Sequence, residues 1–193
     1  MKPDIIRETN AGIFHISIQE IMLQNRQVEC LGPITAEAVN DIILQLLYLD
    51  STAPGEEITL FINSPGGEVS SGLALYDVMQ MINSPVRTVC VGMAASMAAV
   101  LFAAGSEREI LPHARVMIHD PLITQTGGSA LSLKSISEDL MKTRTTTAEI
   151  LARHSGRTLA EIYAKTAADT YFSAEESVSF GLADRIITTF ERS

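Results

Sequence analysis

The sequence predicts an α/β fold with a parallel sheet, because buried strands alternate with helices along the chain. Two short apolar runs typical of strands, "ITLFIN" at 58–63 and "RTVCVG" at 87–92, are each followed by a turn and a helical segment. A third strand, "ARVMIH" at 114–119, precedes a glycine-containing loop and a long helix. Because ligands of parallel sheets bind at the carboxyl ends of the strands, we expect the chemistry of this chain at that edge.

The N-terminal part of the chain has the weakest pattern. Residues 1–27 mix polar and apolar side chains without a clear period, which predicts an irregular arm leading into a short strand at about Gln27–Leu31. The first helix is expected in 35–50, with Thr35 as its N-cap. Its apolar side chains at helical spacing are Ala38, Ile42, Leu46 and Leu49.

The remaining helices follow the strands in order. The segments 70–82 and 93–105 are the helices after the first two buried strands, and the long helix runs from about Ser129 to His154. Two capping boxes, in which a serine or threonine precedes a glutamate by three residues, begin two short helices. These boxes are Thr158 with Glu161 and Ser173 with Glu176, and "DRIITT" at 184–189 is the last predicted strand.

Composition restricts the class of protein. The chain of 193 residues is 46% hydrophobic and 19% charged, which suits one folded domain. Its net charge of −9 argues against a nucleic-acid or anionic-membrane partner, and no run is long and apolar enough for a membrane span. Cys30 and Cys90 lie in apolar runs without metal-type spacing, so we expect buried thiols, no metal site and a cytoplasmic protein.

Two strand ends carry residues suited to nucleophilic catalysis. Ser96 lies in the first turn of the helix after the second buried strand, where its hydroxyl group can act as a nucleophile near free N–H groups, or can simply allow close packing. His119 closes the third strand and is the candidate general base, unless it only bonds a carbonyl group. The histidines that do not follow a core strand are His15, His113 and His154.

A carboxylate is needed to orient a catalytic histidine, and three aspartates are candidates. Asp169 lies in "TAADTYFS", between small and aromatic residues that can shield it from water, although it can also cap the next helix. Asp120 is too close in sequence to reach under His119, and Asp184 follows the last helix. Composition and spacing leave the choice open.

The turn "NSPGG" follows the first buried strand. Its residue types are those of an ordinary turn, and "NSP" recurs at 83–85. Only the first copy carries the pair Gly66–Gly67. Paired glycines allow backbone N–H groups to approach a ligand, as an oxyanion hole requires.

These motifs together resemble the Clp protease proteolytic subunit, ClpP, a family of serine peptidases. The segments "FINSPGG", "GMAASM", "LPHARVMIHDPL" and "SAEESVSFGLADRI" occur in the order and at nearly the spacing of that family, over roughly residues 28–187. The resemblance implies a crotonase-like α/β fold of repeated β-β-α units with a protruding handle helix. It implies a single peptidase domain at 28–193, with the handle at about 122–154, and an N-terminal arm or axial region at 1–27.

The resemblance also implies the roles of individual residues. Ser96 would be the nucleophile, His119 the general base and Asp169 the orienting acid, and the backbone N–H groups of Gly67 and Met97 would form the oxyanion hole. The chain would need no cofactor or metal, since ATP is used by a partner AAA+ unfoldase. The partners implied are unfolded polypeptides and further subunits, in homo- or hetero-oligomers of two stacked heptameric rings.

This sequence departs from the family pattern next to the candidate site. Ala167 and Ala168 replace a charged pair that the family uses in contacts between rings, and Lys165 replaces an acidic residue. Asp120 stands where the family has glutamine. In the handle, Ile123–Thr124 replaces a glycine pair, with glycines following only at 127 and 128, and the link at 104–112 is about two residues shorter.

Three functions remain for comparison. The chain can be a serine endopeptidase of a compartmentalised ATP-dependent protease, cleaving unfolded proteins to short peptides through an acyl-enzyme. It can be a weakly active or structural ring subunit that needs a paralogous partner. It can also be a crotonase-type acyl-CoA enzyme with a glycine-rich oxyanion hole, which the presence of a serine, a histidine and an aspartate together disfavours.

Overall fold

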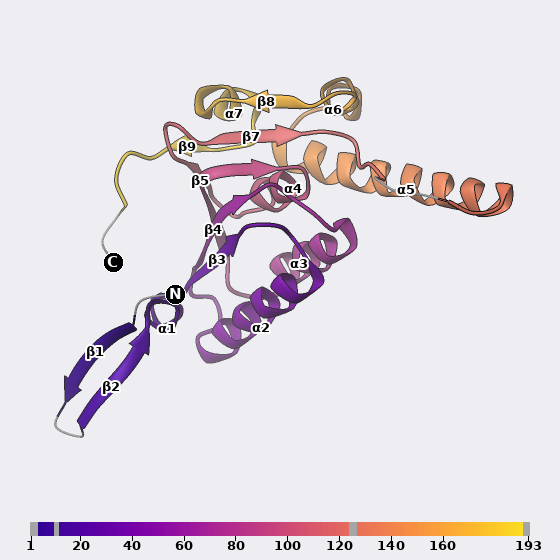
Figure 1. Cartoon of the computed structure of the whole chain (residues 1–193). Helices are drawn as coiled ribbons and strands as arrows, with labels where there is room; N and C mark the ends of the chain where they lie inside the picture. The colour runs from indigo at the N-terminus through magenta and orange to yellow at the C-terminus, as the bar shows by residue number, and fades with distance from the viewer. Residues whose placement is uncertain (1–3, 10–11, 124–126, 191–193) are drawn as a thin grey trace.

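A twisted sheet forms the centre of the protein (Figure 1). The structure is a computed structural model and describes residues 4–9, 12–123 and 127–190. Within these residues the central sheet has seven strands. They are β3 (Gln27–Leu31), β4 (Ile58–Ser64), β5 (Val86–Ala95), β6 (Arg108–Ile110), β7 (Arg115–Ile118), β8 (Thr170–Phe172) and β9 (Arg185–Ile186).

The predicted parallel sheet is confirmed. The strands follow one another in the order β3-β4-β5-β6-β9, and every neighbouring pair on this path is parallel. Strand β7 is also parallel to β5, but β8 is antiparallel to β7. The long strand β5 pairs with β6 through Thr88–Cys90 and with β7 through its last three residues. The carboxyl ends of β5 and β7 therefore lie side by side.

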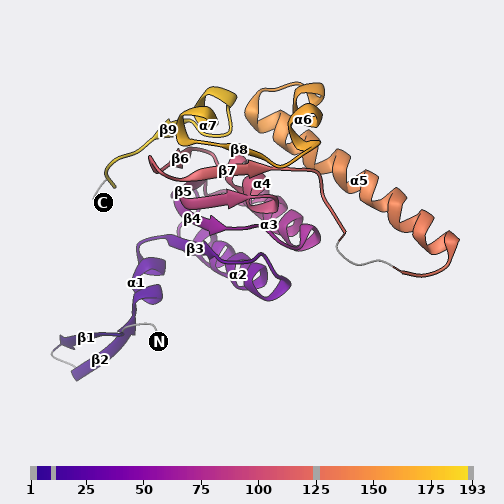
Figure 2. The ribbon, with the colours of Figure 1, turned by 45° about the horizontal axis from the view of Figure 1, so that its top comes forward.

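Three helices cover one face of strands β3 to β5 (Figures 1 and 2). They are α2 (Ala36–Thr52), α3 (Val69–Met81) and α4 (Met97–Ala103). The threonine cap of α2 is present, since Thr35 Oγ1 accepts a hydrogen bond from the N–H group of Ala38. Ala38, which was predicted to face the core, is only half-buried. Val39 lies in the core in its place, beside Ile42 and Leu46.

Every residue of α4 is buried, which explains its composition of small and apolar side chains. The helix lies between β5 and helix α3 and crosses α3 at Gly72. A Cβ atom at Gly72 would overlap the side chain of Met97, so only glycine permits this close approach. Met97, the first residue of this helix, is therefore held in close contact with α3.

The N-terminal residues are not irregular, and that prediction is wrong. Strands β1 (Asp4–Thr9) and β2 (Gly12–Ser17) pair as an antiparallel hairpin that projects away from the sheet (Figure 2). Helix α1 (Ile18–Gln24) joins the hairpin to β3. It starts with a capping box between Ser17 and Glu20, a signal that the sequence carries. The domain boundary at residue 27 stays a prediction.

The C-terminal part agrees with the predicted elements in most places. The long helix is α5 (Ala130–Ser155), which extends well beyond the sheet as a handle does (Figure 1). Both capping boxes start helices, α6 (Leu159–Thr166) and α7 (Ala174–Phe180). Strands β6 and β8 were not predicted, and β9 is shorter than the expected 184–189. Thr124, in the altered handle segment, lies outside the described residues.

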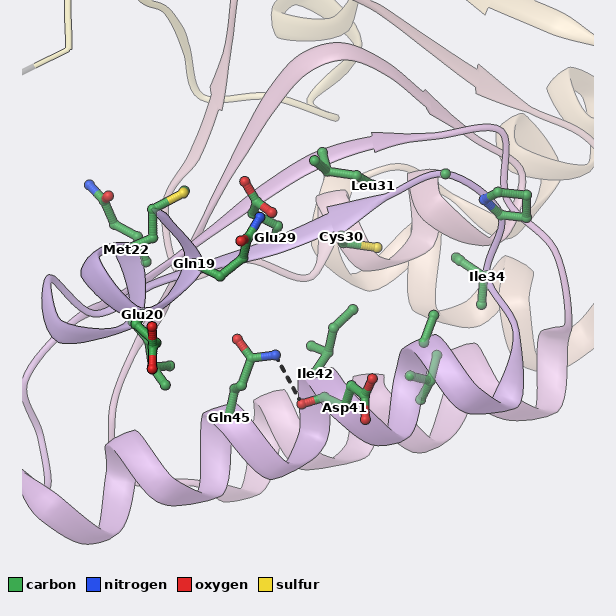
Figure 3. A pocket seen from close by; sticks show the side chains of 16 residues that line it. Gln19, Glu20, Met22, Glu29, Cys30, Leu31, Ile34, Asp41, Ile42 and Gln45 are labelled. Carbon is green, nitrogen blue, oxygen red and sulfur yellow. Dashed lines mark hydrogen bonds between the residues drawn. The ribbon is translucent and has the colours of Figure 1, made fainter. Parts of the chain in front are cut away.

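The two cysteines are buried thiols, as expected. Figure 3 shows Cys30 on β3 above helix α2, near Ile34 and Ile42, at a hollow that also borders α1. Burial raises the pKa of Cys30 to about 11 and that of Cys90 to about 12. Because only the thiolate is a good nucleophile, neither cysteine is suited to covalent catalysis at neutral pH.

His154 is half-buried near the end of α5. Its Nε2 atom lies 3.2 Å from the hydroxyl oxygen of Tyr76, and its carbonyl oxygen accepts a hydrogen bond from Arg108. Burial lowers the pKa of His154 below its usual 6.5, and the charges of Arg108 and Arg153 lower it further. The folded protein therefore favours the neutral imidazole, and stability is lost as the pH falls below the unfolded-state pKa.

We expect substitution of His154 by glutamine to reduce this acid sensitivity. Glutamine keeps a polar partner for Tyr76 but takes up no proton, so one proton-linked cost of folding disappears. The measurement is the difference in melting temperature between about pH 7.5 and about pH 5.5, on the two sides of the usual histidine pKa. The difference should be smaller in His154→Gln than in wild type, and unchanged in the exposed control His113→Gln. Equal differences in all three proteins would contradict the prediction.

Candidate active site

The register of the sheet brings Ser96 next to His119. Strand β5 ends at Ala95 and β7 ends at Ile118, and Ala95 pairs with Met117 in the parallel register. The N–H group of Ser96 donates a hydrogen bond to the carbonyl oxygen of Met117 at 2.8 Å. The Oγ atom of Ser96 lies 2.7 Å from Nε2 of His119, within hydrogen-bond distance.

The antiparallel pairing of β8 with β7 positions the carboxylate. Ile118, the last residue of β7, pairs with Thr170, the first residue of β8. His119 follows Ile118 and Asp169 precedes Thr170, so these two residues lie opposite each other. Asp169 Oδ1 is 3.2 Å from Nδ1 of His119. The side chain of His119 is 14% exposed and that of Asp169 is 58% exposed, so the imidazole is shielded while the carboxylate meets solvent in the single chain.

The other two candidate aspartates have different partners. Asp120 accepts a hydrogen bond from Nε of Arg144 at 2.6 Å, and Asp184 forms an ion pair with Arg108. The hydrogen bonds from Arg108 hold the pKa of Asp184 below its usual value. Of the three aspartates that the sequence left open, the structure brings only Asp169 to the imidazole of His119.

The backbone at Ser96 has an unusual conformation for a residue other than glycine. Its φ is 56° and its ψ is −123°, and its side chain does not cap helix α4. Such a conformation costs about 1–3 kcal/mol and is found mainly at functional sites. It turns the chain sharply from β5 into α4, so that Oγ points toward His119. The turn also depends on Gly66, where a Cβ atom would lie 2.7 Å from Cβ of Ser96.

The backbone N–H groups of Gly67 and Met97 are the candidates for binding an oxyanion. The loop after β4 lies against the start of α4, since a Cβ atom at Gly66 would lie 3.1 Å from the nitrogen of Met97. Across the described residues, the backbone hydrogen bonds outside regular helices and strands include none donated by Gly67 or Met97. Gly67 is held by a bridge to Ile34, in which Ile34 donates to Gly66 and accepts from Glu68.

Substitution of Gly67 by alanine is expected to lower the rate of peptide hydrolysis by about 10² to 10³, the usual cost of losing one oxyanion donor. Its φ is 154°, and an added Cβ atom would overlap the carbonyl oxygen of Ile34, so the loop must shift. The collision is with the backbone of the protein itself. The measurement is kcat on a fluorogenic peptide. A suitable control is Gly55→Ala, where a Cβ atom meets nothing within 4 Å. A folded Gly67→Ala protein with full kcat would contradict the prediction.

A small apolar hollow adjoins Ser96 and His119 between α3, α4 and α5. The hollow cannot be predicted from the sequence, because its walls come from four separate segments whose apolar side chains resemble ordinary core residues. Besides Ser96 and His119, the lining residues are Val69, Met97, Val100, Ile118, Pro121, Thr147 and Leu151.

Across 4–9, 12–123 and 127–190, no group of three or more His, Cys, Asp or Glu side chains is arranged to hold a metal ion. In these ranges there is also no helix with the length and apolar character needed to cross a membrane.

A serine, a histidine and an aspartate joined in this order by two hydrogen-bond contacts have the geometry of the Ser-His-Asp hydrolases. The same geometry occurs on unrelated folds, so it defines the class of site and not the family. The family model described as Clp protease matches residues 10–190, and the chain therefore belongs to the Clp protease family. Its mixed α/β architecture agrees with the ClpP fold. Because the family is one of peptidases, the match disfavours the acyl-CoA enzyme.

Proposed function

We propose that this chain is a serine endopeptidase that hydrolyses unfolded proteins to short peptides through an acyl-enzyme. The single observation that carries the proposal is the contact series from Asp169 to His119 to Ser96, at 3.2 Å and 2.7 Å. The membership in the Clp protease family supports a peptide as substrate. The apolar hollow beside Ser96 supports an apolar side chain before the cleaved bond.

The roles of the three side chains follow from which atoms face one another. When the Nδ1–H group of His119 donates its hydrogen bond to Asp169, the proton is on Nδ1 and the lone pair is on Nε2. Nε2 can then accept the hydroxyl proton of Ser96. The Oγ atom then attacks the peptide carbonyl carbon, and the N–H groups of Gly67 and Met97 bind the oxyanion. The imidazolium returns its proton to the leaving amine, and water hydrolyses the acyl-enzyme by the same steps.

The proposal extends to the assembly. In keeping with the family, the subunits form two stacked heptameric rings around a chamber, and an AAA+ unfoldase feeds unfolded polypeptide into it. ATP is consumed by the unfoldase, so this chain needs neither a cofactor nor a metal ion. We place this machine in the cytoplasm, in protein quality control.

The test is labelling of the purified chain with a fluorophosphonate, analysed by mass spectrometry. These probes react with activated serine hydroxyl groups, so we expect one adduct, located on Ser96. The size of the oligomer is measured in parallel by light scattering. An unlabelled protein, or an adduct located on another serine, would contradict the proposed function.

A second candidate is a ring subunit with low activity that needs a paralogous ring or a bound unfoldase. It is favoured by Ala167 and Ala168, which follow α6 directly and cannot form ion pairs, and by the 58% exposure of the Asp169 side chain. An exposed ion pair contributes about 0.2–1 kcal/mol, but the loss is repeated around a ring. Light scattering and peptide turnover on the isolated chain decide: a stable tetradecamer at submicromolar concentration with high activity would exclude this candidate.

A further inference from the structure

An ion pair lies directly beside the candidate triad. Asp120 follows His119 in the chain, and its Oδ2 atom accepts a hydrogen bond from Nε of Arg144 at 2.6 Å. Arg144 belongs to helix α5, whereas Asp120 belongs to the loop after β7. The pair is only partly exposed, at 27% for the arginine side chain and 31% for the aspartate. It therefore ties the loop that carries His119 to the handle helix.

The same arginine also contacts a third segment. Its guanidinium carbon lies 4.1 Å from the ring centroid of Tyr163, on helix α6. A planar guanidinium group can stack on an aromatic ring and donate hydrogen bonds in its plane at the same time, which a lysine cannot do. A backbone hydrogen bond of 2.8 Å, from Asp120 to Thr166, joins the loop to α6 as well.

These contacts connect the two segments that carry the hydrogen-bonded side chains of His119 and Asp169. The first segment is the loop after β7, where His119 directly precedes Asp120. The second is helix α6 with the residues after it, since α6 ends at Thr166, three residues before Asp169. Arg144 contacts both segments, so a movement of one segment relative to the other would break its contact with Asp120 or with Tyr163. We call the set of Arg144, Asp120 and Tyr163 the arginine clamp.

We propose that Arg144 is a positioning residue, which acts through Asp120 and Tyr163 to hold His119 and Asp169 in contact. The inference rests on the proposed function, because the aligned imidazole matters only if it serves as a base. A partly exposed ion pair contributes little to folding. A misplacement of about 1 Å in a catalytic group can nevertheless lower the rate by about 10². The clamp should therefore affect kcat more than stability.

The experiment is a double-mutant cycle with peptide turnover as the readout. Arg144→Met keeps the length of the side chain and an apolar contact to Tyr163 but removes the charge, and Asp120→Asn removes the charge of the partner. We expect each change to lower kcat about tenfold, within the range for a small misplacement, while KM stays within about twofold. The double variant should lose no more than either single variant, because one interaction is removed in all three.

Two further variants separate positioning from a general structural effect. Lys142→Met removes a charge from the exposed face of the same helix and should retain the wild-type kcat. Arg144→Lys restores the charge without the planar group and should recover only part of the lost kcat. A wild-type kcat in folded Arg144→Met, or losses that multiply in the double variant, would overturn the proposal. If Arg144→Met does not fold, Asp120→Asn and Arg144→Lys carry the same comparison.

Failure of the proposed function would be distinguishable from failure of the clamp. A wild-type chain that does not react with a fluorophosphonate contradicts the peptidase, whatever the variants do. Crystal structures of the wild type and of Arg144→Met test the clamp without activity. The Asp169–His119 contact, 3.2 Å here, should be broken in the variant and kept in wild type. An unchanged contact in the variant would overturn the positioning role.

Discussion

Replacement of Ser96 by alanine is expected to lower kcat for peptide hydrolysis by roughly 10⁶, the loss found when a serine protease loses its nucleophile. Alanine keeps the small volume that helix α4 requires but has no oxygen to attack the carbonyl group. The 2.7 Å contact to His119 disappears with it. The measurement is turnover of a fluorogenic peptide by protein prepared free of host proteases, together with the loss of fluorophosphonate labelling.

The matched control is Ser179→Ala on α7, where the lost hydroxyl group bonds only the carbonyl oxygen of Glu175 within its own helix. This variant should retain wild-type turnover and labelling. Both proteins should keep the wild-type circular dichroism spectrum, so that loss of activity is not loss of fold. If Ser96→Ala hydrolyses peptides at the wild-type rate, Ser96 is not the nucleophile.

Replacement of Asp169 by asparagine is expected to lower kcat by about 10⁴, because the amide favours the wrong tautomer of His119. The amide nitrogen can donate to Nδ1, which leaves the proton on Nε2, and Nε2 then cannot accept the proton of Ser96. The carboxylate that stabilises the imidazolium is also lost. The measurement is kcat with the same peptide, and KM should change little, since the carboxylate does not touch the substrate.

Asp139→Asn, an exposed change on α5, is the control for loss of one negative charge. It should leave kcat unchanged. Full activity in Asp169→Asn would remove Asp169 from the mechanism and would return the choice to Asp120 and Asp184. The ion pairs of these two aspartates with Arg144 and Arg108 argue against that result.

The sequence alone predicts the parts of the fold whose signals are local. The continuous apolar run of β4 predicts a buried strand, and Ile58, Leu60 and Ile62 are fully buried in the structure. Helices α5 and α6 start at side-chain caps. Ser96 and His119 could be paired in advance because each follows the carboxyl end of a parallel strand. The carboxyl ends of parallel strands lie at the same edge of a sheet, so this expectation does not depend on contacts between other segments.

The missing parts depend on contacts between distant residues. The selection of Asp169 needs the antiparallel pairing of β8 with β7, and β8 has only three residues, too few for a recognisable pattern. The hairpin β1–β2 projects away from the central sheet (Figure 2) and leaves Ile5 and Ile6 exposed, so its sequence lacks the alternation that predicts a strand. The contact of Asp120 with Arg144 bridges 24 positions and leaves no periodic signal.

The burial of α4 gives the members of the candidate triad unequal local stability. Amide protons of α4 should exchange with solvent only when the whole domain unfolds, because every residue of this helix is buried. The segment around Asp169, whose side chain is 58% exposed, can open at a much lower free energy. On warming, the carboxylate would leave the imidazole while the serine stays in place. Catalysis would then fail before the fold does, and it would recover on cooling as long as the core remains closed.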